Sequence, residues 1–265
     1  MQKMQCLPLF YVLSLLTACG GGSDSSSSSN SSSGGNTPPP IAANASGIYT
    51  GSTDLGDYTE GLIQSNGKYW FLYGDDTSAR GFIQGTLSTT ANTAKSTNGK
   101  DFNFDTDTVV PVSIDATVNE EKSFNGSVRY NASNIVSFQT VYDPVASARL
   151  VSVDQIQGTY FGDAGVIGGV EPANVTFTAN TGLANTVSFM GTGSGGCEVS
   201  GVLTLSSNKS YFDVEAKTNG YPCLVTNQSL NGVAVYDPSD SSIRLATVTD
   251  DRNQALLFIG SKSLL

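Results

Sequence analysis

The chain has 265 residues, no histidine, 14% charged residues and a formal net charge of 13 − 23 = −10. Without histidine, Ser-His-Asp and Cys-His catalytic devices and His-bearing metal sites are excluded. An acidic chain also lacks the basic surface that binds phosphate backbones, so we expect no nucleic-acid partner. What remains is a Gly-rich chain whose patterning is typical of β structure.

Residues 1–18 have the pattern of a lipoprotein signal peptide. Lys3 precedes an apolar run from Leu7 to Leu16 that is too short to span a bilayer. The run ends in Leu-Thr-Ala-Cys, which resembles the lipobox of bacterial lipoproteins and implies cleavage before Cys19 and acylation (palmitate) of that residue. An ordinary signal peptide with a chance cysteine is the alternative. Two or more acyl chains are sufficient for stable anchoring.

The next segment, residues 19–45, has the composition of a tether. Residues 20–37 contain nine Ser and five Gly and no apolar side chain, so nothing offsets the entropy of ordering them. Pro38, Pro39 and Pro40 then form a short stiff spacer. We expect a disordered leash that holds a folded body away from a membrane.

The body alternates apolar and polar residues with Gly or Asn-Gly punctuation, and it divides into residues 46–150 and residues 151–265. Phe124, Gly126, Val128 and Tyr130 are typical of the period-2 runs. Asn66-Gly67 between two such runs predicts a hairpin with a type I′ turn. The first half has eight predicted strands, at 47–53, 58–65, 68–73, 79–88, 99–105, 111–118, 123–130 and 135–142. The second half has eight more, at 157–162, 173–179, 185–190, 197–206, 209–217, 229–237, 242–249 and 254–261.

Eight short sequential strands are best satisfied by an up-and-down barrel, because closure removes exposed edges. The predicted fold class is therefore all-β, with two tandem antiparallel eight-stranded barrel-like domains after a disordered tether. A sandwich is the alternative. A short linker or helical turn is expected near residues 151–157.

Two cysteines remain in the mature body, Cys197 and Cys223. In an oxidising compartment an even pair without a CxxC motif predicts a structural disulfide in the second domain. The first domain has no such bridge, so we expect it to unfold first and only the second to respond to reductant.

The run from residue 69 to residue 73 is apolar on both faces of a strand. A small barrel buries one face of each strand, so the other face must be covered by the second half, by a partner or by a loop. An inter-half contact is the simplest explanation of this run, and a candidate binding surface centred on Trp70 and a small-ligand cavity lined by Tyr69, Phe71 and Tyr73 are the alternatives. Its members are Tyr69, Trp70, Phe71 and Tyr73.

Three further patterns have simpler explanations. Residues 191–196 match the letters of GxGxxG but precede a strand-like run, which indicates a hairpin loop. Asn103, Asp105 and Asp107 lack the Gly and Glu of a calcium loop. Asp213 and Glu215, spaced like paired carboxylates, are typical of the solvated side of a sheet. We assign no catalytic residue, no metal and no cofactor, and expect no enzyme.

The lipobox, the Gly/Ser leash and the Gly-x-Tyr-x-Gly strand starts at Gly47 and Gly158 resemble surface lipoproteins of Gram-negative bacteria. The body is similar in style to transferrin-binding-protein-B-like lobes and to proteobacterial lipoproteins without an assigned activity. The last predicted strand runs into Leu-Phe-Ile-Gly-Ser-Lys at residues 257–262, where the first group has a Phe-Gly-rich element, so no partner-contacting residue carries over.

The resemblance implies an outer-membrane lipoprotein, anchored by its N-terminal lipid and facing the periplasm or the cell surface. A non-enzymatic binding or surface-interaction module, with a protein partner or small ligand, is the leading hypothesis. A structural envelope lipoprotein and a small-ligand carrier that uses a barrel interior are the alternatives.

Overall fold

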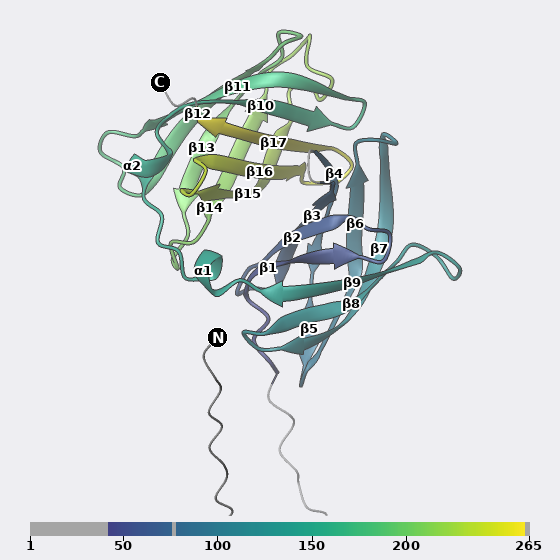
Figure 1. The fold of residues 1–265 in the computed structure, drawn as a ribbon. Coiled ribbons are helices and arrows are strands. Elements are labelled where there is room, and N and C mark those ends of the chain that lie inside the picture. Colours follow the sequence, from purple (N-terminus) through teal and green to yellow (C-terminus); the bar gives the residue numbers. More distant parts are fainter. Residues whose placement is uncertain (1–41, 76–77, 263–265) are drawn as a thin grey trace, which may run out of the picture. The chain divides into compact units, whose positions relative to one another are not determined.

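Antiparallel strands form two closed barrels that follow each other along the chain (Figure 1). The computed structural model describes residues 42–75 and 78–262. The predicted fold class of two tandem eight-stranded antiparallel barrels is confirmed. The expected signal peptide, Cys19 and most of the expected tether lie outside the described residues.

In the first barrel, strands that follow each other in sequence pair, except β4 with β5; β9 pairs with β1, and a β4–β6 pairing closes the ring. The short strand β5 pairs with β6 outside this ring of eight. The strands are β1 (Gly47–Thr53), β2 (Tyr58–Ile63), β3 (Lys68–Gly74), β4 (Ala79–Thr86), β5 (Ser88–Thr90), β6 (Thr93–Asn103), β7 (Thr108–Asn119), β8 (Ser123–Arg129) and β9 (Ile135–Tyr142).

Two helical turns, α1 (Pro144–Ser147) and α2 (Val153–Ile156), connect the barrels, the second of them where a linker was expected. The second barrel closes where β10 pairs with β17. Its strands are β10 (Gly158–Val166), β11 (Gly169–Ala179), β12 (Thr186–Gly193), β13 (Glu198–Leu205), β14 (Phe212–Thr218), β15 (Ser229–Asp237), β16 (Ser242–Thr249) and β17 (Ala255–Lys262).

The hairpin between β2 and β3 lies where Asn66-Gly67 predicted it, but its turn is different. The amide of Gly67 donates to the carbonyl of Gln64, and of the central pair only Gly67 has a positive φ, of 82°. A type I′ turn needs positive φ at both central residues, so the predicted type I′ turn is wrong, and the turn ends instead in a single left-handed glycine. Asn66 keeps ordinary geometry, and its side chain accepts a hydrogen bond from the amide of Lys68.

Each barrel has its own packed interior. In the first, inward aromatic rings meet, as where Phe71 stacks on Phe124 at 5.6 Å between ring centroids. In the second, Tyr160 packs edge-on against Phe177 at 5.2 Å. Ile156 of α2 is fully buried in this second interior, so the linker covers the end of the barrel at which β10 begins.

A third buried cluster joins the outward faces of the two barrels, which belong to one unit that spans Pro40–Leu265. It explains why several strands are apolar on both sides. We call it the shared cluster; its buried members are Ile48, Leu62, Trp70, Phe82, Phe102, Phe104, Ala146, Tyr211, Val233, Ala246, Val248, Ala255 and Leu257.

Candidate functional site: two barrel cavities

The aromatic run on β3 is not an exposed surface. Tyr69 is fully buried and Phe71 is 7% exposed, both within the interior of the first barrel. Trp70 points to the opposite face and is 4% exposed within the shared cluster, with its ring 5.8 Å from that of Phe82. Tyr73 is half-buried and donates a hydrogen bond to Asp101.

Tyr69, Trp70 and Phe71 therefore form no exposed surface on which a partner could dock. The physical reason is the alternation of the strand: one face fills its own barrel and the other packs against the second barrel. The inter-half contact that the two-sided pattern allowed is the arrangement observed for Trp70.

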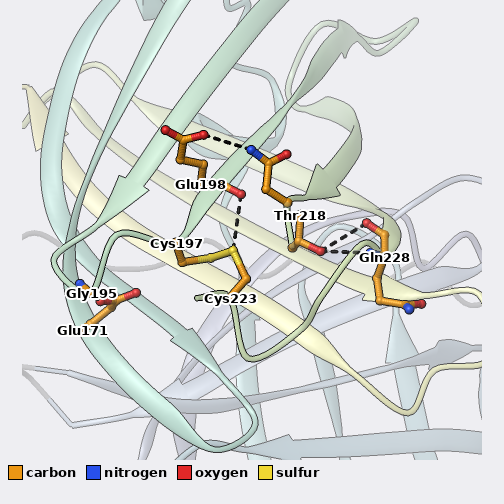
Figure 2. The surroundings of a disulfide bond; sticks show 8 residues. Glu171, Gly195, Cys197, Glu198, Thr218, Cys223 and Gln228 are labelled. Atoms are coloured by element: carbon orange, nitrogen blue, oxygen red, sulfur yellow. Dashed lines mark hydrogen bonds between the residues drawn. A yellow bond between two sulfur atoms is a disulfide. The ribbon is translucent and has the colours of Figure 1, made fainter. Parts of the chain in front are cut away.

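The expected disulfide is present between Cys197 and Cys223, with their Cα atoms 4.5 Å apart. Figure 2 shows it joining the β12–β13 turn to the segment between β14 and β15, residues 219–228, which we call the Cys223 loop. The start of this loop is also held by Asn219, whose amide donates to the Glu198 carbonyl and whose side chain donates to the Glu198 carboxylate.

The other patterns fall where their simpler explanations place them. Gly191–Gly196 forms the end of β12 and its turn into β13. Asp213 and Glu215 both lie on the exposed side of β14. Asp105 and Asp107 belong to an exposed turn, and no group of acidic or cysteine side chains within the described residues could hold a metal ion.

A cavity of about 330 Å³ occupies the end of the second barrel opposite α2. This end carries the turns at 167–168, 194–197 and 250–254 together with the Cys223 loop. The strands contribute mainly apolar side chains to its wall, among them Ala164, Val166, Ala173, Val175, Phe189, Val199, Leu245, Leu256 and Phe258.

Small residues at inward positions leave this space empty. Ala173 pairs with Gly193 across β11 and β12, and Val175 pairs with Gly191. The next inward pair toward α2 is Phe177 with Phe189, whose rings meet and fill the barrel. The change from small to large residues along the same two strands therefore sets the depth of the cavity.

The rim of the cavity is fixed by polar contacts and by the disulfide. The carboxylate of Glu171 accepts hydrogen bonds from the hydroxyl of Ser194 and the amide of Gly195, which ties β11 to the β12–β13 turn. The Cys223 loop adds Pro222, Leu224 and Val225 to the lining. Glu171 is the one ionisable side chain among the described lining residues, apart from the bridged Cys197.

A second cavity, of about 260 Å³, lies at one end of the first barrel. Its lining is mixed, unlike that of the second barrel. Apolar and aromatic side chains come from Phe71, Ile83, Ile114, Val128 and Phe138, and polar ones from Asp57, Tyr73, Arg80, Asn103, Asp105 and Tyr130. Asp57 and Arg80 form an ion pair with each other.

Asp101 does not line this cavity itself but contacts two residues that do, Tyr73 and Tyr130. It is 4% exposed, and its two carboxylate oxygens accept hydrogen bonds from Tyr73 at 2.8 Å and from Tyr130 at 2.9 Å. Burial raises the pKa of Asp101, and the two tyrosine hydrogen bonds oppose that shift. Burial, reinforced by the neighbouring carboxylate, raises the pKa of both tyrosines, so both remain protonated donors.

Sequence reasoning kept a ligand cavity lined by Phe71 and Tyr73 as an alternative, and both residues line the cavity of the first barrel, but it missed Asp101 and the cavity wall of the second barrel. Ala and Gly at inward positions look like weak strand residues rather than the wall of a space. Asp101 has one usable signal, because it alternates with Asn103 and Gly99 while Phe102 faces the other way, which places an acid on the inward side of β6.

Within residues 42–75 and 78–262, no helix combines the length and the hydropathy that a membrane crossing requires. No family model matches the sequence, and no curated protein matches it.

Several solved structures resemble the chain. A candidate outer membrane protein from Bacteroides fragilis matches at 14% identity and a TM-score of 0.28, over 84% of this chain and 98% of that one. Two variants of the vaccine antigen transferrin binding protein B from Haemophilus parasuis match at 10% and 11% identity, each with a TM-score of 0.30. These two matches cover 78% and 79% of this chain, which spans 65% and 66% of theirs. The family named from the sequence is thus among the matches, and values this low carry no activity across to this chain.

Proposed function

We propose that this chain is a lipid-anchored envelope protein that binds a small, uncharged, apolar molecule inside its second barrel without transforming it. The main support for this proposal is the cavity of about 330 Å³. Its volume lies at the lower end of the range for small-molecule pockets, which is roughly 300–1,000 Å³. An apolar cavity of this kind favours ligands that lose little hydration on entry.

The chemistry of the lining favours binding over catalysis. Among the described lining residues, Glu171 is the one candidate acid or base, and its Oε2 atom is held at the rim by hydrogen bonds from Ser194 and Gly195. Cys197 is bonded to Cys223 and is no free nucleophile. A cavity with these groups can select by shape and apolarity, and it offers no base or nucleophile aimed at a substrate.

Binding can be tested with N-phenyl-1-naphthylamine, an uncharged apolar dye that fluoresces when it leaves water. The mature chain is purified from membranes into nanodiscs, and each variant is compared in the same nanodiscs so that dye in the lipid cancels. Wild type should show saturable binding. Ala173→Leu, which fills the cavity, should weaken it at least tenfold.

Asn174→Leu is the matched control, because Asn174 is the next residue on β11 and faces solvent. It should bind the dye like wild type. Ala164→Leu fills the cavity from β10 and provides a second variant if Ala173→Leu melts early. Equal dye binding by wild type and the cavity-filling variants, or no saturable binding by wild type, overturns the proposal. The alternative of a structural envelope lipoprotein would then remain.

The anchor is tested separately. The lipobox at Leu16–Cys19 and the Ser/Gly tether support acylation of Cys19 and an outer-membrane location. Cells that express wild type should incorporate labelled palmitate into the chain and retain it in the outer-membrane fraction, whereas Cys19→Ser should do neither. An unlabelled, soluble wild-type protein would contradict the anchor and would leave the dye experiment unaffected.

A further inference from the structure

Asp101 is a buried carboxylate without a cation. It faces the interior of the first barrel, in register with the inward residue Ile83 of β4. Within the described residues no Lys or Arg forms an ion pair with it, and its side-chain contacts are the neutral hydroxyls of Tyr73 and Tyr130. A buried carboxylate is costly to ionise unless it is paired with a cation, and a bound cation would supply the pairing that the neutral tyrosine hydroxyls do not.

The two tyrosines connect this charge to the cavity of the first barrel, because both line it. Each hydroxyl donates to Asp101, which enriches its ring in electron density. Together with Phe71 and Phe138, they give the cavity four aromatic side chains. Aromatic faces attract organic cations, and several faces around one space form the usual recognition site for a quaternary ammonium group.

The remaining charges on the cavity wall have the same sign. Arg80 is the one basic residue among the described lining residues, and it is paired with Asp57. Asp105 lies at the exposed part of the lining and has no ion pair within the described residues. After this pairing, the charges left facing or backing the cavity are the carboxylates of Asp101 and Asp105.

We propose that the open end of the first barrel binds a small organic cation, with its positive group against the rings of Tyr73 and Tyr130 and in front of Asp101. The alkyl part would contact Ile83 and Ile114, deeper in the cavity. The volume of about 260 Å³ restricts the ligand to a small ammonium compound. This site is separate from the second-barrel cavity, so the two proposals stand or fall independently.

An inorganic cation fits this site less well. Calcium and magnesium need six or more oxygen ligands, whereas the hydroxyls of Tyr73 and Tyr130 are already directed at Asp101. The mixed aromatic and aliphatic wall would leave such an ion without its hydration shell. This wall fits an organic cation better, because such a cation carries apolar groups of its own.

The test is isothermal titration calorimetry of the mature chain in nanodiscs with choline and with 3,3-dimethyl-1-butanol, the uncharged carbon isostere of choline. Choline should bind saturably, and the isostere at least tenfold more weakly. The absence of choline binding overturns the proposal. Equal binding of the two compounds also overturns it, because size and apolarity would then account for the affinity without the positive charge.

Variants locate the charge. Asp101→Asn should weaken choline binding at least tenfold, whereas Asp115→Asn should leave it unchanged. Asp115 is the matched control because its exposed carboxylate pairs with Lys95 on the outside of the same barrel. Similar losses in both variants would mean that choline responds to overall charge, against the proposal.

Two further variants keep the result interpretable if Asp101→Asn folds poorly. Tyr130→Leu removes one ring and should weaken choline binding, while Tyr130→Phe keeps the ring and should retain more affinity than Tyr130→Leu. Ala173→Leu, which fills the other barrel, should bind choline like wild type. Loss of choline binding in Ala173→Leu would contradict a site in the first barrel.

Discussion

Trp70, the one tryptophan of the chain, is buried between the two barrels with its indole nitrogen in contact with no hydrogen-bond acceptor among the described residues. Its contribution is therefore one of area and shape rather than of polar contacts. A buried indole N–H without a partner carries a desolvation cost, which offsets part of what the ring contributes.

We expect Trp70→Ala to lower the free energy of unfolding by about 3–5 kcal/mol, because it leaves a cavity in the shared cluster. Trp70→Phe should cost less than about 2 kcal/mol, since it keeps an aromatic ring and removes the unpaired donor. Urea denaturation followed by far-UV circular dichroism measures both values. Val141→Ala, at a side chain 65% exposed, is the control and should be close to neutral. Equal losses for Phe and Ala would contradict this account of the indole.

Asp101 gives the chain a specific dependence on pH. Burial raises the pKa of this carboxyl above its ordinary value of 3.8, so between the two pKa values the folded state binds more protons than the unfolded chain. Its stabilising contribution is fully present below the unfolded pKa and is lost as the pH rises through the folded pKa.

The free energy of unfolding of wild type minus that of Asp101→Asn should therefore fall as the pH rises from below 3.8 to neutrality. The pKa of Glu60 and of Asp213 is raised by burial as well, and their effects cancel in this difference because both variants retain them. Chemical denaturation at a series of pH values provides the measurement. A difference that stays flat across this range would show that Asp101 ionises no less readily when folded.

At the scale of elements, the period-2 pattern located the strands because one face of every strand is buried and the turns are marked by Gly and Asn. The turn chemistry was less predictable: Asn66-Gly67 fits two hairpin turns, and the closed ring selected the one in which only Gly67 has a positive φ. The cavities were not predictable, because an empty space depends on how four or more strands taper together, as at Ala173 and Gly191.

The Cys223 loop is the element whose order depends most on a single bond. The disulfide closes a loop across 26 residues, so the Cys197→Ser, Cys223→Ser double variant should lose about 3 kcal/mol of stability. Thermal unfolding with and without reductant measures the loss. Reductant should lower the melting temperature of wild type and leave the double variant unchanged. If reductant leaves the melting temperature of wild type unchanged, the disulfide does not stabilise the Cys223 loop as we expect.

At the scale of the whole molecule, the sequence indicated two halves but not how far they depend on each other. The two-sided apolar run at residues 69–73 was its one hint of an inter-half contact. The structure adds polar links: Arg252, in the β16–β17 turn, donates to the carbonyls of Gln84 and Asn98, and Lys100 donates to the carbonyl of Asp251 and the side chain of Asn253. Glu60 and Arg244 add an ion pair at 3.4 Å.

These links change the expectation drawn from the cysteines alone. If the shared cluster couples the barrels, removing the disulfide should also destabilise the first barrel, although both cysteines lie in the second. Native-state hydrogen exchange can test this, because the amides of β7 and β8 lie in the first barrel on strands that contribute no buried residue to the shared cluster. In the Cys197→Ser, Cys223→Ser variant, their free energy of opening should fall together with that of β13 and β14. A triple variant that also carries Arg252→Ala should show a smaller fall in the free energy of opening of β7 and β8, because this substitution removes two of the hydrogen bonds between the barrels. Unchanged protection of β7 and β8 when the disulfide is lost would mean that the barrels unfold independently, with the first indifferent to the bridge in the second.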